Sequence, residues 1–348
     1  MKKELIKLSS LGGISGFEYT ISEDIQSLIC DFCDETYVET SGNVIGIIRN
    51  GKENAKKVMI EAHIDGIGLM VKDIDEKGFI SFVPIGGIDS GILPYTEVIV
   101  YGEKKLFGII AAKSPAVLSD SEQDKKYPLS ELVIDVGMSA EDVKKYVKIG
   151  DMISFASGAK KLSSKIFSGK YFDDRAGLIT LLIALKKLKN TSLDFDIYIL
   201  CATCEEVGLR GAKTGSYNIE PDCAVVVDVC HGKTPDSGND STFELGSGAV
   251  ISKGPNIHPF LSTLAENVAK SEKIKYNIDV DGGDTGTDAW AVQVTKSSIP
   301  TLLLSIPLRY MHTTIETLSY TDLESIGSLI AAILKNLDLE ELSCIYQL

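Results

Sequence analysis

Several acidic and histidine-containing segments of this sequence carry side chains that bind divalent metal ions. The candidates come from five segments, which hold His63 with Asp65, Asp173 with Asp174, Glu205 with Glu206, Asp228, and His312. Two histidines with three or more carboxylates are the ligand set of a site for two zinc or similar divalent ions, in which one carboxylate bridges the metals. Such a pair of ions polarises a peptide carbonyl and activates a water near neutral pH. The residue types therefore point to metal-assisted hydrolysis.

A buried strand leads to the first of these histidines. Residues 57–62 are apolar except for Lys57 and Glu61, and His63 follows directly. Open α/β sheets place their ligands at the carboxyl ends of strands, so His63 is expected at such an edge. Asp65 lies two residues further on, where its carboxylate would hydrogen-bond the imidazole. A lone His-x-Asp occurs often by chance, so its meaning depends on the other segments.

Two adjacent aspartates, Asp173 and Asp174, stand at the start of a helix expected over 174–189. Acidic residues at a helix N-terminus are commonly capping groups. One of the two is therefore expected to cap the helix, which leaves the other free to bind metal.

Three further candidates follow strands. Glu205 and Glu206 come after the strand 195–203, and adjacent carboxylates at a buried strand end need a cation to offset their repulsion. One of them would bind metal while the other moves a proton from water to the departing amine. Asp228 ends the apolar run 224–227, where a buried carboxylate must be paired or metal-bound. His312 follows the strand 301–305, so all five candidate ligands can converge on one edge of a sheet.

The elements that position these residues alternate between strands and helices from residue 165 onward, which indicates an α/β domain with a largely parallel sheet. Further helices are expected over 259–271, around Ala289 and over 321–337, and a strand over 276–280. Residues 67–160 contain only brief β-rich runs and one short capped helix at 139–146. We therefore predict a mixed, largely parallel sheet flanked by helices, interrupted by an inserted small β-barrel.

Composition excludes several other classes of protein. The net charge of −14 disfavours a nucleic-acid partner, and the apolar stretch 176–185 is half of the ~20 residues that a membrane span needs. The N-terminus lacks the pattern of a secretory signal, so we expect a cytoplasmic protein. The Cys-x-x-Cys pairs 30/33 and 201/204 are too far apart in sequence for a zinc ribbon, and reduced, largely buried thiols are the simpler interpretation.

Together and in this order, the motifs resemble those of the dinuclear metallo-aminopeptidases that assemble into tetrahedral dodecamers, a family with glutamyl, leucyl and deblocking members, some labelled endoglucanases. The matching segments span nearly the whole chain and are 62–70, 172–177, 205–212, 227–228, 254–259 and 306–312. The resemblance implies a zinc-exopeptidase-like catalytic domain of residues 1–66 plus 161–348. Residues 67–160 would be the inserted β-rich dimerisation domain.

The same resemblance assigns roles to the candidate residues. The ligands that it implies are His63 and Asp228 for one metal, Glu206 and His312 for the other, and Asp173 as the bridge. It makes Glu205 the general base and Asp65 the residue that orients His63. Two divalent ions are implied, with zinc first and cobalt or manganese as alternatives. The expected substrates are short peptides cleaved at a free N-terminus, and the expected assembly is a homo-oligomer of dimers forming a dodecamer.

One position departs from the family pattern. The family usually has Glu after the Asp of its first motif, and this chain has Gly66, so a carboxylate near the site is missing. This leaves the ligand set intact and puts the substrate preference in question. Of the remaining histidines, His231 is expected to pack or to support a ligand, and His258 is expected to have a structural role before a helix.

Three other functions compete with an aminopeptidase. A deacylase or carboxypeptidase would use the same metals on a substrate without a free amine. A glycosidase would need two carboxylates flanking one bond, about 5–9.5 Å apart, for which the adjacent Glu205 and Glu206 are poorly arranged. A metal-binding scaffold without activity would have no need of an unliganded glutamate.

Overall fold

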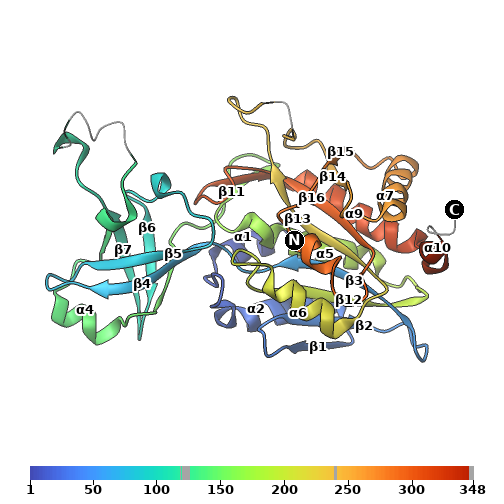
Figure 1. The fold of residues 1–348 in the computed structure, drawn as a ribbon, viewed down its shortest axis with the longest axis horizontal. Helices are drawn as coiled ribbons and strands as arrows, with labels where there is room; N and C mark the ends of the chain where they lie inside the picture. The colour runs from blue at the N-terminus through green and yellow to red at the C-terminus, as the bar shows by residue number, and fades with distance from the viewer. Residues whose placement is uncertain (118, 120–125, 239–240, 345–348) are drawn as a thin grey trace.

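A large mixed sheet forms one lobe of the molecule and a closed β-barrel forms the other (Figure 1). The computed structural model describes all residues except 118, 120–125, 239–240 and 345–348. The predicted fold class, a largely parallel helix-flanked sheet with an inserted small barrel, is confirmed.

The central strands of the large sheet are parallel and buried. The path runs through β1 (Glu35–Val38), β2 (Val44–Ile48), β12 (Phe195–Ala202), β3 (Lys56–His63), β13 (Cys223–His231), β16 (Thr301–Arg309), β17 (Glu316–Ser319), β11 (Ile166–Gly169) and β10 (Lys160–Lys161). Beside it, β16 pairs with β14 (Ala249–Lys253), which pairs with β15 (Tyr276–Val280). Strands covered on both faces read as near-continuous apolar runs, and every residue of β12 is buried.

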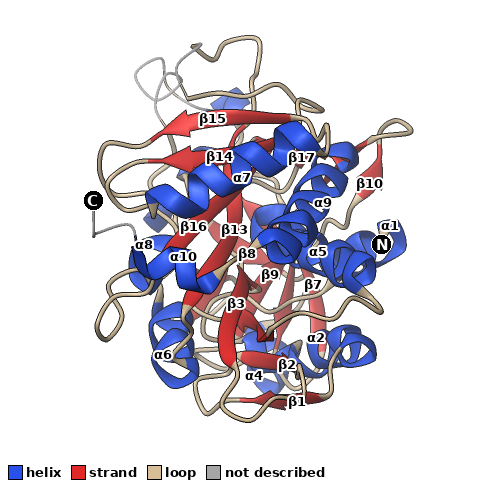
Figure 2. Cartoon of the chain, turned by 90° about the vertical axis from the view of Figure 1, so that its right-hand side faces the viewer, coloured by secondary structure: helices blue, strands red, loops and turns tan. Residues whose placement is uncertain are grey.

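Helices cover both faces of this sheet (Figure 2). On one face lie α5 (Phe172–Leu188) and α9 (Tyr320–Asn336), and on the other lie α6 (Arg210–Ile219) and α8 (Asp288–Val292). All of α5 except Lys186 and Lys187 is buried, because strands β3 and β13 cover one side of it and α9 the other. The remaining helices of the large lobe are α1 (Lys2–Ser10), α2 (Ser22–Ile29), α7 (Pro259–Ser271) and α10 (Leu339–Cys344).

The barrel has its own hydrophobic core, separate from that of the sheet. Its strands close in the order β4 (Gly68–Ile74), β5 (Ile80–Ile85), β8 (Val133–Asp135), β7 (Lys105–Ala111), β6 (Glu97–Tyr101) and β9 (Met152–Phe155). The predicted short helix is α4 (Ala140–Tyr146), where the Ser139 hydroxyl accepts a hydrogen bond from the Asp142 N–H at 3.3 Å. The exact domain boundaries and the dimerisation role stay predictions.

Two sequence-based expectations need correction. Asp228 was expected at a strand end, but β13 continues to His231 because β16 extends alongside it and pairs Asp228 with Ser305. His231 was expected to pack or to support a ligand, whereas its side chain is exposed at the end of β13 and lines a cavity. Among the described helices, none has the length and apolar character of a membrane span.

Candidate metal centre

All five predicted ligands lie together, although they come from five separate segments. His63 ends β3, Glu206 follows β12, Asp228 lies within β13, His312 follows β16, and Asp173 lies in the first turn of α5. Their ligand atoms form two groups, each with its atoms within 4.8 Å of one another. One group is His63, Asp173 and Asp228, and the other is Asp173, Glu206 and His312. The groups share Asp173, as a bridging ligand would require.

The Asp173 carboxylate faces a histidine on each side. Its Oδ1 lies 3.1 Å from Nε2 of His63, and its Oδ2 lies 3.3 Å from Nε2 of His312. The neighbouring Asp174 has the other predicted role, since its Oδ1 accepts a hydrogen bond from the Gly177 N–H at 3.0 Å. One aspartate thus caps α5 while the other turns both oxygens toward the cluster.

His312 is held by the barrel lobe as well as by the sheet. Its Nδ1 lies 2.9 Å from the carbonyl oxygen of Gly87, which follows β5. A carbonyl only accepts, so Nδ1 carries a proton, and in the neutral ring Nε2 then has the free electron pair that a metal ion needs. That Nε2 lies 3.3 Å from Oε2 of Glu206. Metal-binding histidines commonly donate their other ring N–H in this way.

Asp65 connects the first histidine to the glutamate loop. Its Oδ1 lies 3.5 Å from Nδ1 of His63, close enough to orient the ring. The same carboxylate accepts the backbone N–H groups of Glu205 at 3.1 Å and Glu206 at 3.3 Å, and the Ser15 hydroxyl at 2.6 Å. Burial opposes ionisation of Asp65, but the neighbouring His63, followed by the Ser15 and Glu205 hydrogen bonds, lowers the pKa of Asp65 below its ordinary value. Asp65 therefore stays ionised and fixes both neighbouring segments.

The crowded acids lack enough positive charge from the protein. Burial raises the pKa of Asp228 to about 8 and that of Glu205 to about 10, with neighbouring carboxylates adding to the shift. Burial and Asp173 likewise raise the pKa of Glu206 well above its ordinary value. Bound cations would remove this penalty. The donor set, the tautomer of His312 and the excess of buried carboxylates all fit divalent metal ions.

The Glu205 side chain differs from that of its neighbour. It lines the cavity beside the cluster, and within the described part of the chain its carboxylate makes no hydrogen bond or ion pair. It also belongs to neither group of convergent ligand atoms. Glu205 thus lies beside the cluster, outside both ligand groups and without a partner for its carboxylate among the described residues.

Two supporting residues were not identified from the sequence. Glu316 on β17 accepts the N–H groups of Phe172 at 2.7 Å, Asp173 at 3.2 Å and His312 at 3.1 Å. The fully buried Arg175 donates to several carbonyls, including that of Ile64 at 2.9 Å. Glu316 contacts backbone groups about 140 residues away in sequence, so only its spacing four residues after His312 could have suggested a role.

Gly66 also has a structural explanation. A Cβ atom at this position would lie 2.5 Å from Cδ1 of Tyr171, whose ring is buried. The space in which a side chain at position 66 would begin is therefore filled by Tyr171. Position 66 thus has no carboxylate, and the Tyr171 ring lies beside it. None of the five predicted ligands is changed by this departure from the family pattern.

The fold and the cluster define an α/β peptidase with a carboxylate–histidine centre at the ends of parallel strands. The chain belongs to the M42 glutamyl aminopeptidase family, whose model matches residues 42–329. The lysyl aminopeptidase of Pyrococcus furiosus is 34% identical over 95% of this chain and 96% of the relative. Membership of this family makes the chain an aminopeptidase-type hydrolase of a metal-dependent kind.

Solved structures agree with this assignment. The aminopeptidase APDkam598 from Desulfurococcus kamchatkensis is 33% identical, with a TM-score of 0.91 over 99% of this chain and 96% of that one. The TET1 peptidase of Pyrococcus horikoshii, described as able to assemble into a tetrahedron or a large octahedral shell, is 33% identical with a TM-score of 0.84. That match covers 96% of this chain and 98% of the TET1 chain. The predicted resemblance is confirmed.

Proposed function

We propose that this chain is an aminopeptidase that removes N-terminal residues from short peptides with two divalent metal ions and Glu205 as general base. The observation that carries the proposal is the position of Asp173, which belongs to both groups of ligand atoms and directs one oxygen to the histidine of each group. One carboxylate shared between two ligand sets is the arrangement of a two-metal site.

In this proposal, five residues are metal ligands and Glu205 is the general base. His63 and Asp228 would hold one ion, Glu206 and His312 the other, and Asp173 both. When bound, the ions supply the positive charge that polarises the scissile carbonyl and acidifies a water. Zinc suits this mixture of nitrogen and oxygen ligands best, and cobalt or manganese are alternatives.

Glu205 performs the proton transfers. Its unpaired carboxylate on the cavity wall would accept a proton from the attacking water and then donate it to the departing amine nitrogen. The positive charge of the ions would lower the raised pKa of Glu205, so that the carboxylate is ionised before water attacks. Asp65 keeps His63 and the Glu205–Glu206 loop in position through the contacts described above.

The proposal is tested by amino-acid release from unblocked and N-acetylated short peptides. The protein is stripped of metal and then supplied with zinc, cobalt or manganese. Metal-dependent release from unblocked peptides alone is expected. Release from acetylated peptides would favour the deacylase alternative, and cleavage of cellulose oligomers after complete metal removal would favour the glycosidase.

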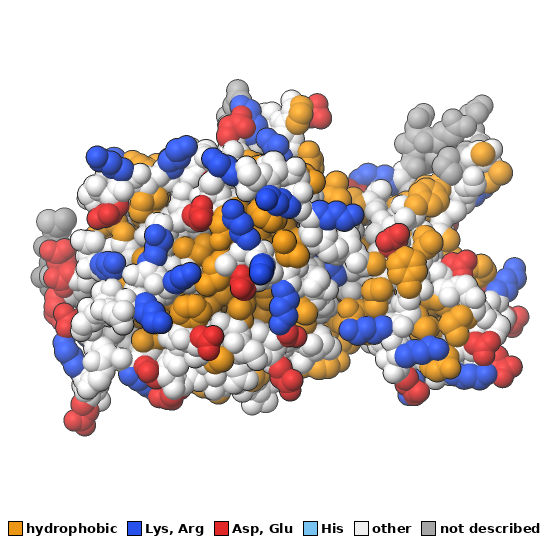
Figure 3. Space-filling model, turned by 180° about the vertical axis from the view of Figure 1, so that it is seen from behind, with side chains coloured by type: hydrophobic (Ala, Val, Ile, Leu, Met, Phe, Trp, Pro, Cys, Tyr) orange, Lys and Arg blue, Asp and Glu red, His pale blue; other side chains and the backbone are white. Residues whose placement is uncertain are grey.

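We further propose a homo-oligomer built from dimers, with a dodecamer as the expected assembly. Hydrophobic side chains gather on one face of the barrel, the right-hand lobe in Figure 3. The barrel also exposes Phe107 (52%) and Ile109 (45%) two residues apart on the outer side of β7, and contiguous apolar side chains on a surface mark interaction sites. Light scattering should give a mass well above 37.6 kDa, reduced by Phe107→Glu. A monomeric wild type would contradict this assembly.

The cytoplasmic location remains a prediction from the sequence.

A further inference from the structure

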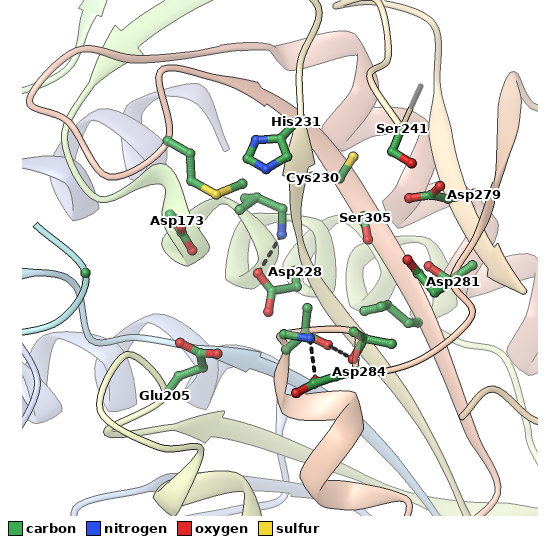
Figure 4. A pocket seen from close by; sticks show the side chains of 18 of the residues that line it. Asp173, Glu205, Asp228, Cys230, His231, Ser241, Asp279, Asp281, Asp284 and Ser305 are labelled. Carbon is green, nitrogen blue, oxygen red and sulfur yellow. Dashed lines mark hydrogen bonds between the residues drawn. The ribbon is translucent and has the colours of Figure 1, made fainter. Parts of the chain in front are cut away.

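A cavity of about 620 Å³ extends from the candidate metal centre to a second set of acids. Its lining includes Asp173, Glu205 and Asp228 at one end and Asp279 and Asp281 at the other, and Asp284 lies low in the view of Figure 4. This volume is in the usual range for a pocket that encloses a small ligand. The second acids come from β15 and the loop after it, and the metal centre uses none of them.

The strand register places both ends on one face of the sheet. Asp228 on β13 pairs with Ser305 on β16, and Ser305 pairs with Val250 on β14. Ser252, two residues after Val250 and on the same face, pairs with Asp279 on β15. Three strand spacings of about 4.8 Å, with the two-residue step of about 7 Å along β14, separate the backbones of Asp228 and Asp279 by roughly 16 Å. A long substrate side chain is needed to reach from one end to the other.

The far acids have no cationic partner. In the part of the chain that the structure describes, Asp279, Asp281 and Asp284 form no ion pair, and the Asp281 carboxylate accepts no hydrogen bond. Asp279 and Asp281 are half-buried, and burial together with the Asp279 charge raises the pKa of Asp281. Two like charges in a cavity without a counter-ion favour an incoming cation.

Two buried hydroxyls between the ends provide a second and independent sign of a ligand. Ser252 is 1% exposed and Ser305 is 4% exposed, and both line the cavity. Figure 4 shows Ser305 between Asp228 and Asp281. Among the described residues neither hydroxyl makes a hydrogen bond, and both open on the cavity, where a ligand can reach them. A bound molecule with a polar end would satisfy them.

We propose that Asp279 and Asp281 form a subsite for the positively charged side chain of the substrate's N-terminal residue, so that lysyl and arginyl peptides are preferred. This inference rests on the proposed aminopeptidase function and names its substrate class. An organic cation fits better than a third metal ion. The only two described groups of three or more convergent ligands contain neither of these aspartates.

The experiment compares kcat/KM for lysyl, arginyl, norleucyl and glutamyl p-nitroanilides by the metal-loaded enzyme. Norleucine has the length of lysine without the charge, so the lysyl-to-norleucyl ratio isolates the ion pair. We expect a ratio of about ten or more in the wild type, because a charged pair in a partly dehydrated pocket is worth at least that factor. In Asp279→Asn/Asp281→Asn the ratio should fall about tenfold. The matched control is Asp194→Asn, an acid exposed by 91% outside the cavity, which should leave the ratio unchanged.

A binding measurement gives a readout that does not depend on turnover. Calorimetry on metal-loaded Glu205→Gln should show tighter binding of lysinamide than of norleucinamide, and the two Asp→Asn changes should remove the difference. A wild-type ratio near or below one with good norleucyl hydrolysis would overturn the subsite and leave the proposed function standing. An equal loss for both substrates in the double variant would also overturn it, since the acids would then bind the α-ammonium. No release from any substrate would overturn the proposed function and this inference with it.

Discussion

The two ends of the cavity hold acids in different ways. At the metal end, Asp173 and Glu206 lie within 3.3 Å of histidine nitrogens and their side chains are almost completely buried. At the far end, Asp279 and Asp281 are half-buried and no histidine is paired with them in the described chain. Buried carboxylates that converge with imidazoles suit small divalent ions, which need several ligand atoms within a few ångströms. Separated, partly wet carboxylates suit an ammonium or guanidinium group, which one or two acids are enough to bind.

This comparison predicts that changes at the metal end abolish the reaction, whereas changes at the far end alter only its selectivity. Asp173→Ala should have the largest effect, because both ions lose a ligand. Activity should fall more than about a thousandfold, since the charge stabilisation supplied by bound metal is worth several kcal/mol. Elemental analysis should find metal lost from both positions. The control is Asp174→Asn, which keeps the helix cap and should keep both ions. Two ions per chain in Asp173→Ala would refute the bridge.

Glu205→Gln should separate catalysis from metal binding. Both ions are expected to remain, while kcat falls by about 10² to 10⁴, the usual contribution of a general base. Glu205→Asp should regain part of the rate, because a carboxylate is restored at a shorter reach. Retained activity in the glutamine variant would remove Glu205 from its role. Loss of metal would instead make Glu205 a ligand.

Asp65→Asn should have an intermediate effect on metal affinity. The change replaces a carboxylate with a neutral amide. That carboxylate faces Nδ1 of His63 and accepts the Glu205 and Glu206 N–H groups. Loss of such supporting groups typically lowers metal affinity about 10- to 100-fold. Competition with a chelator of known affinity measures the change. Ser15→Ala removes only one hydrogen bond to Asp65 and should cost less. Equal affinities in wild type and Asp65→Asn would show that Asp65 does not position His63.

Ser305→Ala should give the smallest effect and should act on selectivity. The lysyl ammonium would donate a hydrogen bond to the Ser305 hydroxyl. Because water in the cavity can replace that hydroxyl, the net contribution should be roughly 0.5–1.5 kcal/mol, so the lysyl-to-norleucyl ratio should fall a few-fold. Ser241→Ala, at a more exposed position of the same cavity, is the control. A larger loss in the control than in Ser305→Ala would place the side chain elsewhere in the cavity.

Local sequence signals predicted the parts of the fold that depend on burial and helix ends. The helix Pro259–Ser271 and the strand Tyr276–Val280 have the predicted bounds, because a proline starts the one and β-type residues form the other. The exposed strands β1 and β10 were not predicted, and neither were β2, β11, β14 and β17, although β2, β14 and β17 are largely buried.

The ligands of the candidate site were predictable from local signals, as were the helix and strand named above. The ligands follow apolar runs or precede a helix, and such local signals can be read from one sequence. The proposed subsite was not predictable. Asp279 lies on the same face of the sheet as Asp228 only because the four strands β13, β16, β14 and β15 pair in this register. Glu316 was missed for a similar reason, since two of its three partners, the N–H groups of Phe172 and Asp173, are distant in sequence.

The most direct test of the central claim is anomalous diffraction from crystals of the zinc-loaded protein. The account predicts two peaks on either side of the Asp173 carboxylate, one against His63 and Asp228 and the other against Glu206 and His312. A single peak, or a pair that does not share Asp173, would contradict the two-metal centre.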